Sequence, residues 1–502
     1  MINRSLIRIK TIQILYSYLL SRNDFKLETI PDPMTSSRDR RYAYSVYLNL
    51  LFLLVKLSGV SLNRGVAGGV MPDVDNKVKN NKIGRSLADH PAIKVLAKQN
   101  EKELTRFDSI VSELSDAIKI SSVLADYKKV KAPELSDDVA FWSTVFGSII
   151  QKNEKVEKIF RKDEDFSHVG FEHAFAMLDG TLKSFEMSRS TYLNSRKALA
   201  ESLDRAYDLY HALLLLPVRI TEFQARRLDN AKHKYLPSAE DLNPDTHFID
   251  NIFVKRLTED EDFMKYFEEN PTADPANWNG SDKLLSDLTD LVVESDLYKQ
   301  YMTQRQVDYE NDCRFWRDVM RSVVIPSDEL TDVLEGNSVY WNDDLMIIGT
   351  FALKTIKKAS LDPVGKLPIL PKFMDDDDAR FGGEIFEYVV RNRELYRSYI
   401  ERFIDTKQWD ADRLAFMDMV LMMAAIAELT EYPQIPVAVT LNEYIEIAND
   451  YSTRRSGQFI NGVLYSVIRT LAEEGKLGKP YIMSERKSAP VQASASGETP
   501  KA

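Results

Sequence analysis

Apolar residues recur at helical spacing along most of the chain, and no sustained alternation of apolar and polar residues marks a strand. A first helix is predicted near the N-terminus, with a buried face made of Ile9, Ile12, Tyr16 and Leu19. A second stripe, basic at both ends, runs beside that face and is interpreted as a solvated flank; it consists of Arg4, Arg8, Thr11, Leu15, Tyr18 and Arg22. The pattern therefore predicts an all-α fold.

The sequence also repeats itself. Residues 141–150, FWSTVFGSII, match residues 315–324, FWRDVMRSVV, with Phe, Trp, Val and Ser at equivalent places. Upstream of each lies another matching pair at a similar offset, AYSVYLNLLFL at 43–53 and AYDLYHALLLL at 206–216. A weaker third copy begins at Phe381 with FGGEIFEYVV. We interpret this as an ancient duplication with small insertions.

Each copy continues with an aromatic residue and a polar cluster, at Phe166, Trp341 and Trp409. A second apolar helix follows, and Asn342 or Asp410 is well suited to cap it. The repeated unit is therefore predicted to be two helices joined by a short linking segment. Because two such helices bury little surface alone, we expect the copies to pack on one another.

The densest pattern lies near the C-terminus, where an apolar helix is predicted from about residue 413 to 429, ending before Pro433. Asp418 and Glu428 are its only acidic residues, and both are candidates for contact with a protein partner. For Asp418 the alternative, a buried acid paired within the bundle, is equally weighted. This helix is expected to be central in its domain.

Two further helices are predicted after it. Thr440 and Glu443 have the spacing of a capping box for the helix LNEYIEIANDY. A polar turn, STRRSG, then leads into a last helix, FINGVLYSVIRTLA. The end of the chain, rich in Ser, Ala and Pro, is expected to be disordered.

Composition narrows the functional classes. A formal net charge of −11 over 502 residues argues against a protein that coats nucleic acid, so any RNA contact must be local. The single cysteine, Cys313, excludes an internal disulfide and fits a reducing, cytoplasmic setting. No glycine loop, metal-ligand pair or activated nucleophile is found, so neither an enzyme nor a cofactor is expected. The apolar runs are too short to cross a membrane.

Two stretches at opposite ends of the chain resemble one family. The run VTLNEYIEIANDYSTRRSGQFINGVLYSVI is similar to the closing pair of helices of NusB proteins, and RIKTIQILYSYLLSRND is similar to their first helix. The match covers about a quarter of the chain. The resemblance implies a NusB-like helical bundle, enlarged here by duplicated helical-hairpin repeats. The expected segments are an N-terminal NusB-like helix at 1–25, insertion repeats at 26–200 and 201–377, a NusB-like core at 378–480 and a disordered tail at 481–502.

The same resemblance implies a transcription antitermination factor that binds a single-stranded, boxA-like leader element of ribosomal RNA. Its implied partners are a small-subunit ribosomal protein of the NusE type and the transcription elongation complex. The RNA contacts that carry over are Arg4, Arg8, Tyr16, Ser456 and Phe459. The residues themselves add Tyr18 for base stacking, and Arg454 and Arg455 for phosphates at a helix N-terminus. For Tyr16 and Phe459, core packing is an equally weighted alternative.

Two departures from the family pattern bear on RNA affinity. The basic stretch of the first helix is thinner than in many members, and Arg455 stands where an acidic residue is common. Two other hypotheses therefore remain: a protein-only scaffold that has lost RNA binding, and a helical repeat protein whose duplicated middle is the functional part.

Overall fold

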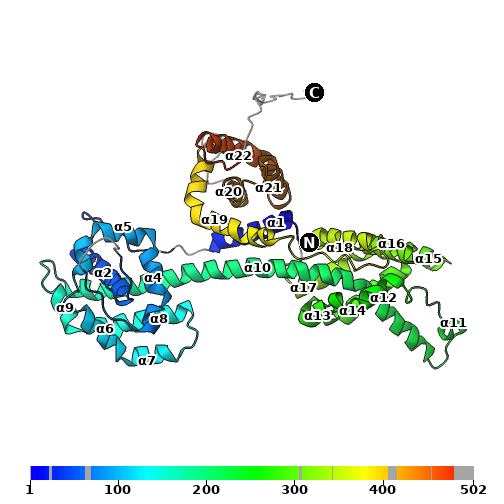
Figure 1. The fold of residues 1–502 in the computed structure, drawn as a ribbon, viewed down its shortest axis with the longest axis horizontal. Helices are drawn as coiled ribbons and strands as arrows, with labels where there is room; N and C mark the ends of the chain where they lie inside the picture. Colours follow the sequence, from blue (N-terminus) through cyan, green and yellow to red (C-terminus); the bar gives the residue numbers. More distant parts are fainter. Residues whose placement is uncertain are drawn as a thin grey trace, which may run out of the picture. The chain divides into compact units, whose positions relative to one another are not determined.

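The computed structural model describes residues 2–21, 25, 27–62, 69–304, 308–341, 343–404, 415–453 and 455–479. These residues form helices and no strand, as Figure 1 shows, which confirms the predicted all-α class. The chain divides into two compact units: unit 1 comprises Met1–Ser17 and Arg196–Ala502, and unit 2 comprises Tyr18–Ser195. The five segments expected from the sequence remain a prediction.

Unit 2 contains the first repeat. Its helices are α2 (Arg38–Leu57), α3 (Asn76–Lys79), α4 (Lys82–Asp89), α5 (Pro91–Gln99), η1 (Glu101–Thr105), α6 (Val111–Lys119), α7 (Ser122–Lys129), α8 (Leu135–Val145), η2 (Phe146–Ile150) and α9 (Glu154–Phe160). The N-terminal part of α10 (His168–Lys232) completes the unit. The apolar helix α2 is buried along most of its length and lies in the core with Trp142 of α8.

Unit 1 contains the second repeat and the C-terminal bundle. The second repeat uses the remainder of α10, then α11 (Ala239–Leu242), α12 (Ile252–Glu259), α13 (Glu261–Glu269), η3 (Pro271–Ala273), η4 (Pro275–Asn277), α14 (Ser281–Glu294), α15 (Asp296–Met302), α16 (Tyr309–Val319), η5 (Met320–Val324), α17 (Asp328–Asn337) and α18 (Leu345–Ala359). The bundle consists of α1 (Arg4–Ser21), α19 (Asp376–Glu401), α20 (Phe416–Glu431), α21 (Val437–Tyr451) and α22 (Ser456–Glu473).

The two repeats have the same local backbone. In each, the helix that carries Phe and Trp, α8 or α16, continues directly into one turn of π-helix, η2 or η5. The π-turns start at the residues predicted to be equivalent, Phe146 and Met320. Because π-helix is rare, its occurrence at the same register in both copies supports the duplication.

A buried polar network joins the start of the Phe-Trp helix to two neighbouring helices in each repeat. In the first repeat, Asn81 donates to the Tyr127 hydroxyl at 3.2 Å, and Tyr127 donates to Asp138. The second oxygen of Asp138 accepts the Lys82 amide at 3.0 Å, at the start of α4. Burial is the main cause that raises the pKa of Tyr127, so its hydroxyl stays a donor.

The second repeat forms the same network from the equivalent Asn, Tyr and Asp residues. Asn251 donates to the Tyr301 hydroxyl at 3.0 Å, and Tyr301 donates to Asp312 at 2.7 Å. The Ile252 amide donates to the other Asp312 oxygen at 2.6 Å. An Asn that caps one helix, a Tyr that ends another and an Asp that starts a third are thus joined identically in both copies.

Helix α10 contributes to both repeats. Thr181, in its first part, shares a hydrogen bond of 2.9 Å with Tyr47 of α2. Tyr210, in its second part, shares the corresponding bond of 2.8 Å with Thr355 of α18. The first part of α10 is therefore equivalent to α18, and its second part is equivalent to α2.

The segment predicted to be a third copy lies in the C-terminal bundle. Phe381 is buried in α19, and α20 packs against α19, α21 and α22, which gives α20 its central place. The backbone of α19 departs from helical geometry at Asn392. Trp409, Asp410 and Asn342 lie outside the described residues.

The predicted capping box is wrong. Helix α21 begins at Val437, a turn earlier than expected, because Pro436 in extended geometry already starts it. Thr440 and Glu443 are therefore inside the helix, where their side chains meet partners from other helices.

No helix within the described residues is both long and apolar enough to span a membrane.

Candidate functional site

The first helix, α1, is buried on both of its predicted stripes. Arg8, Thr11 and Leu15 are all buried, so the expectation of a solvated flank is wrong. The reason is that α1 packs against two sets of elements within unit 1. Lys10 forms a buried ion pair of 2.7 Å with Asp344 at the start of α18 and donates to the Tyr340 carbonyl at 3.1 Å.

Arg8 was expected at the surface and instead lies in the core, 3% exposed. Its guanidinium donates two bonds of 2.8 Å to Glu428 and one of 3.0 Å to Glu443. Burial alone would lower the pKa of Arg8, but the bonds to Glu428 hold it raised. The interpretation of Arg8 as a surface charge is therefore wrong, because its charge is used inside the bundle.

Glu428 is fully buried, and it also accepts a bond of 2.8 Å from Thr440. A carboxylate that is enclosed and bonded on both oxygens has no surface to offer a protein partner. The structure thus contradicts the expected partner contact at Glu428.

Asp418 is buried and bonded within the bundle, which is the alternative predicted for it. It accepts bonds from the hydroxyls of Ser452 at 2.6 Å and Ser456 at 3.0 Å. The Ser456 hydroxyl also accepts the Thr453 amide at 3.2 Å. Asp418 therefore joins the start of α20 to the turn between α21 and α22, and Ser456 is a buried part of that joint.

Three less buried residues, Tyr16, Phe416 and Arg455, adjoin this joint. The Tyr16 ring meets the Phe416 ring edge to face, with centroids 5.3 Å apart, and Phe416 is 37% exposed. Arg455, whose side chain is exposed, directly precedes α22. We name Tyr16, Phe416, Asp418, Arg455 and Ser456 the Phe416 cluster.

The Phe416 cluster unites some of the predicted RNA contacts and leaves others apart. Arg4 lies twelve residues before Tyr16 in α1, about 18 Å along the helix axis, and forms an ion pair of 2.6 Å with Asp378. Tyr18 is buried in unit 2, where its ring lies 6.4 Å from that of Tyr192. Phe459 is half-buried on α22, and Arg454 lies outside the described residues.

Sequence reasoning missed Phe416. Its only signal was an aromatic residue at the exposed start of a helix whose other apolar residues belong to the core. The cluster combines the half-buried Tyr16 ring, the exposed Phe416 ring and an exposed cation, Arg455, at the start of an 18-residue helix. Aromatic rings stack on unpaired bases, while cations and helix N-termini favour phosphate.

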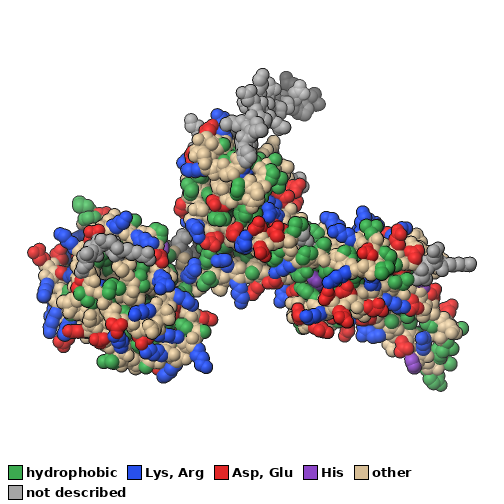
Figure 2. All heavy atoms as spheres, in the orientation of Figure 1, with side chains coloured by type: hydrophobic (Ala, Val, Ile, Leu, Met, Phe, Trp, Pro, Cys, Tyr) green, Lys and Arg blue, Asp and Glu red, His purple; other side chains and the backbone are tan. Residues whose placement is uncertain are grey.

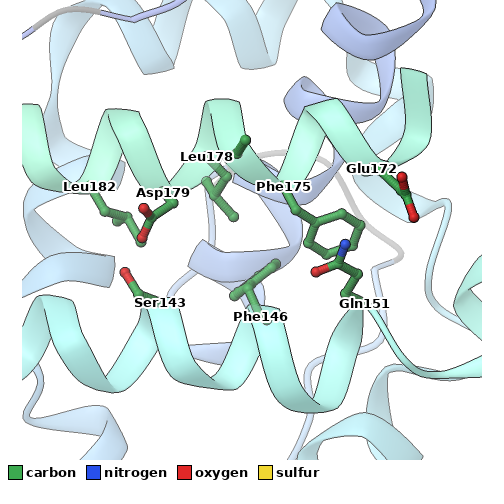
Figure 3. A pocket seen from close by; sticks show the side chains of 10 residues that line it. Ser143, Phe146, Gln151, Glu172, Phe175, Leu178, Asp179 and Leu182 are labelled. Atoms are coloured by element: carbon green, nitrogen blue, oxygen red, sulfur yellow. The ribbon is translucent and has the colours of Figure 1, made fainter. Parts of the chain in front are cut away.

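A cavity of about 300 Å³ lies elsewhere, in unit 2 between α8, η2 and α10. Figure 3 shows Phe146 and Phe175 along its walls and the polar ends of Ser143 and Asp179 directed toward each other. None of the predicted site residues lines it. Within the described part of the chain, no group of three or more His, Cys, Asp or Glu side chains is arranged to hold a metal ion.

Comparisons with known proteins point to one family. A model described as "NusB family" matches residues 352–469, which include α19, α20, α21 and most of α22. The chain is similar to transcription antitermination proteins NusB from Salinibacter ruber (34% identity, 21% of this chain and 66% of the relative), Chloroherpeton thalassium (34%, 25% and 58%) and Dictyoglomus turgidum (30%, 22% and 78%). The matched part thus spans less than two thirds of the first two relatives. No solved structure was found to match the chain.

Proposed function

Because the chain belongs to the NusB family, we propose that it acts in transcription antitermination by binding a single-stranded RNA element at the Phe416 cluster. The observation that carries the proposal is the pair of the half-buried Tyr16 and the exposed Phe416, which the bond from Ser456 to Asp418 ties to the segment of Arg455. Helix α20 and the first part of α22, which position Phe416 and Arg455, lie within the region matched by the family model, whereas Tyr16 of α1 lies outside it.

The chemistry of the cluster supports this assignment. An unpaired base stacked on an aromatic side chain contributes about 1 to 3 kcal/mol. The adjacent phosphate would meet Arg455 and the amides at the start of α22. The Asp418, Ser452 and Ser456 bonds hold these two parts in fixed register.

The finer specificity rests on the resemblance. The proposed RNA is a boxA-like element of the ribosomal RNA leader, and the proposed protein partners are a NusE-type ribosomal protein and the transcription elongation complex, in the cytoplasm. The protein acts as a non-enzymatic adaptor. Asp418 and Glu428 are not proposed as contacts with the ribosomal protein, since both are enclosed.

The test compares three full-length proteins by fluorescence anisotropy with a boxA-like single-stranded RNA. The double variant Phe416→Ala/Arg455→Ala should bind at least tenfold more weakly than wild type and lose about 0.7 from the slope of log affinity against log salt. The matched control, Arg469→Ala, removes an exposed arginine from the other end of α22 and should bind like wild type. Equal affinity of the double variant and wild type would refute the site. Arg8→Ala is unsuitable, because it removes a core ion pair.

One observation favours the protein-only scaffold as a second candidate. Of the basic residues predicted to contact RNA from α1, Arg8 is enclosed and Arg4 is engaged with Asp378, which leaves α1 little free positive charge. A wild-type chain that binds a NusE-type protein but no RNA, alone or in that complex, would select the scaffold.

A further inference from the structure

A group of exposed cations lies in the first repeat, far along the chain from the Phe416 cluster. It comprises Lys79, Lys82, Arg85, Lys128, Lys129 and Lys131, and we name it the basic face. Figure 2 shows Lys and Arg side chains over the part of unit 2 where Figure 1 labels α7. In a chain of net charge −11, such a local excess of positive charge stands out.

The fold assembles the basic face from two segments. Lys82, at the start of α4, donates to the Pro133 carbonyl at 3.2 Å, and Lys77 donates to the Val130 carbonyl at 2.7 Å. The segment after α7 is thereby held beside the start of α4. Lys131 lies in that segment, between the two carbonyls that are bonded.

A hollow of about 290 Å³ opens on this face. Its lining includes Lys79, Asn80, Lys82, Arg85 and Ser86, with one acid, Asp89. Asp89 is itself within 3.4 Å of Lys94. No apolar side chain lines the hollow, so it suits a small, strongly charged group.

Much of this charge is not neutralised by the protein. No carboxylate of the described residues lies within 4.0 Å of the cationic atoms of Lys79, Arg85 or Lys131. Lys82 is bonded to a carbonyl and keeps its full charge. Lys129 is paired with Asp126 at exposed positions where solvent weakens the pairing, and Lys128 is paired at 2.7 Å with the half-buried Asp75.

The second repeat shows that the shared fold does not need these cations. The Asn, Tyr and Asp network aligns the two copies, so Lys79 and Lys82 correspond to Ile249 and Ile252. By the same register, Lys128 and Lys129 correspond to Met302 and Thr303.

Arg85 and Lys131 keep their charge type, as Lys255 and Arg305; Arg305 lies outside the described residues. Lys255 is paired with Asp250 at 2.8 Å. The same internal structure thus carries six cations in the first copy, and four of these six positions hold an uncharged residue in the second.

We propose that the basic face binds the phosphate backbone of RNA, as a second, sequence-independent contact beyond the Phe416 cluster. The inference rests on the proposed function for its choice of RNA. Lysines meet phosphates as flexible point charges and position a backbone without reading bases. The core of a protein interface needs an apolar component, which the hollow does not have. An anionic membrane would also attract these cations, and the vesicle experiment distinguishes it from RNA.

The test measures binding of the full-length chain to a single-stranded RNA without a boxA-like element, across a salt titration. The variant Lys79→Gln/Lys82→Gln/Lys131→Gln should lose at least fivefold in affinity, and its salt slope should fall by about 2, at roughly 0.7 per phosphate contact. The control Lys155→Gln/Lys158→Gln/Lys162→Gln removes the same charge from exposed positions of the same unit and should bind like wild type.

Two further arms separate the outcomes. If the basic-face variant loses binding to this RNA while Phe416→Ala/Arg455→Ala keeps it, the inference stands even if the proposed site fails. If the basic-face variant binds RNA like wild type, the inference falls, and the proposed function is judged by its own experiment. Flotation with vesicles of phosphatidylserine and phosphatidylcholine tests the other anionic surface; loss of vesicle binding with unchanged RNA binding overturns the inference in favour of a membrane.

Discussion

In the first repeat Trp142 donates its indole N–H to Asn81 at 3.1 Å, whereas the equivalent Trp316 of the second repeat has no hydrogen-bond partner among the described residues. Around these rings the Asn, Tyr and Asp networks are the same in both copies. At the surface the copies differ, since four of the six cations of the basic face are replaced by uncharged residues in the second copy. The two copies have therefore kept the buried hydrogen-bond network that their fold requires, while their surface residues have diverged.

The C-terminal bundle extends the comparison to a third copy. Asp378 precedes Phe381 by the same spacing as Asp138 precedes Phe141, but its partner is Arg4 of α1 rather than a tyrosine. The aspartate partner in the bundle is thus a charged guanidinium, where the two repeats have a neutral tyrosine hydroxyl. Different substitutions should therefore affect the three copies to different degrees.

The largest effect is expected in the bundle. Glu428→Ala should lower the free energy of unfolding by about 4 kcal/mol, because it leaves the Arg8 guanidinium buried without its main partner. Guanidinium denaturation followed by circular dichroism measures this. Glu431→Ala, at the exposed end of the same helix, is the control. A loss below about 1 kcal/mol would contradict the view that this pair is enclosed.

Removing the shared aspartate should affect both repeats alike. Asp138→Ala and Asp312→Ala each leave a buried tyrosine hydroxyl and a backbone amide without an acceptor, which costs about 3 kcal/mol. The same denaturation experiment applies to both. If one variant is damaged and the other is not, the two networks are not energetically equivalent.

His211 should make the second repeat sensitive to acid. It is buried between Tyr207, Tyr210, Phe263, Tyr266 and Phe267, with Asp208 beyond, bonded to Tyr266. Burial lowers its pKa to about 4. The unfolded chain then binds more protons than the folded chain below pH about 6.5, so stability falls as the pH falls from there toward 4.

Between pH 7 and pH 5 this loss should be about 2 kcal/mol, at roughly 1.4 kcal/mol per pH unit. The first repeat has Leu48 at the equivalent position. The variant His211→Leu should therefore remove most of the loss in denaturation curves recorded at the two pH values. An unchanged pH dependence would assign the acid sensitivity to other groups.

The tryptophans should respond unequally. Trp142→Phe removes a hydrogen bond, while Trp316→Phe removes an N–H that has no partner in the described structure. Both lose similar buried area, so Trp142→Phe should cost about 1 kcal/mol more. Thermal unfolding of the two variants side by side measures the difference, and an equal or reversed order would contradict it.

The smallest effect is expected on the basic face. Lys79→Gln/Lys82→Gln/Lys131→Gln should change the free energy of unfolding by less than about 0.5 kcal/mol, because these side chains are exposed. Denaturation of this variant beside wild type tests the claim that its surface charge serves binding rather than folding. A loss of several kcal/mol would make the charges part of the fold.

Much of the fold could be predicted from the chain. Helical spacing of apolar residues predicted the all-α class, and the matched FW segments predicted a duplication that the π-turns at Phe146 and Met320 support. The run around Phe459 and the first helix predicted the family. These features are local in sequence, or are compared between two stretches of it, so no tertiary contact is needed to recognise them.

Tertiary structure alone decided which charges stay at the surface. Arg8 and Glu428 are 420 residues apart, and their pairing depends on α1 packing against α20. Periodicity gave α1 one buried face, but it could not reveal that elements pack on both sides of the helix. Periodicity could not reveal the exposure of Phe416 either, because exposure depends on whether another segment of the chain packs over the residue. A residue's own sequence neighbourhood determines its helix and its face; its burial and its ionic partner are determined by distant segments that meet only when the chain folds.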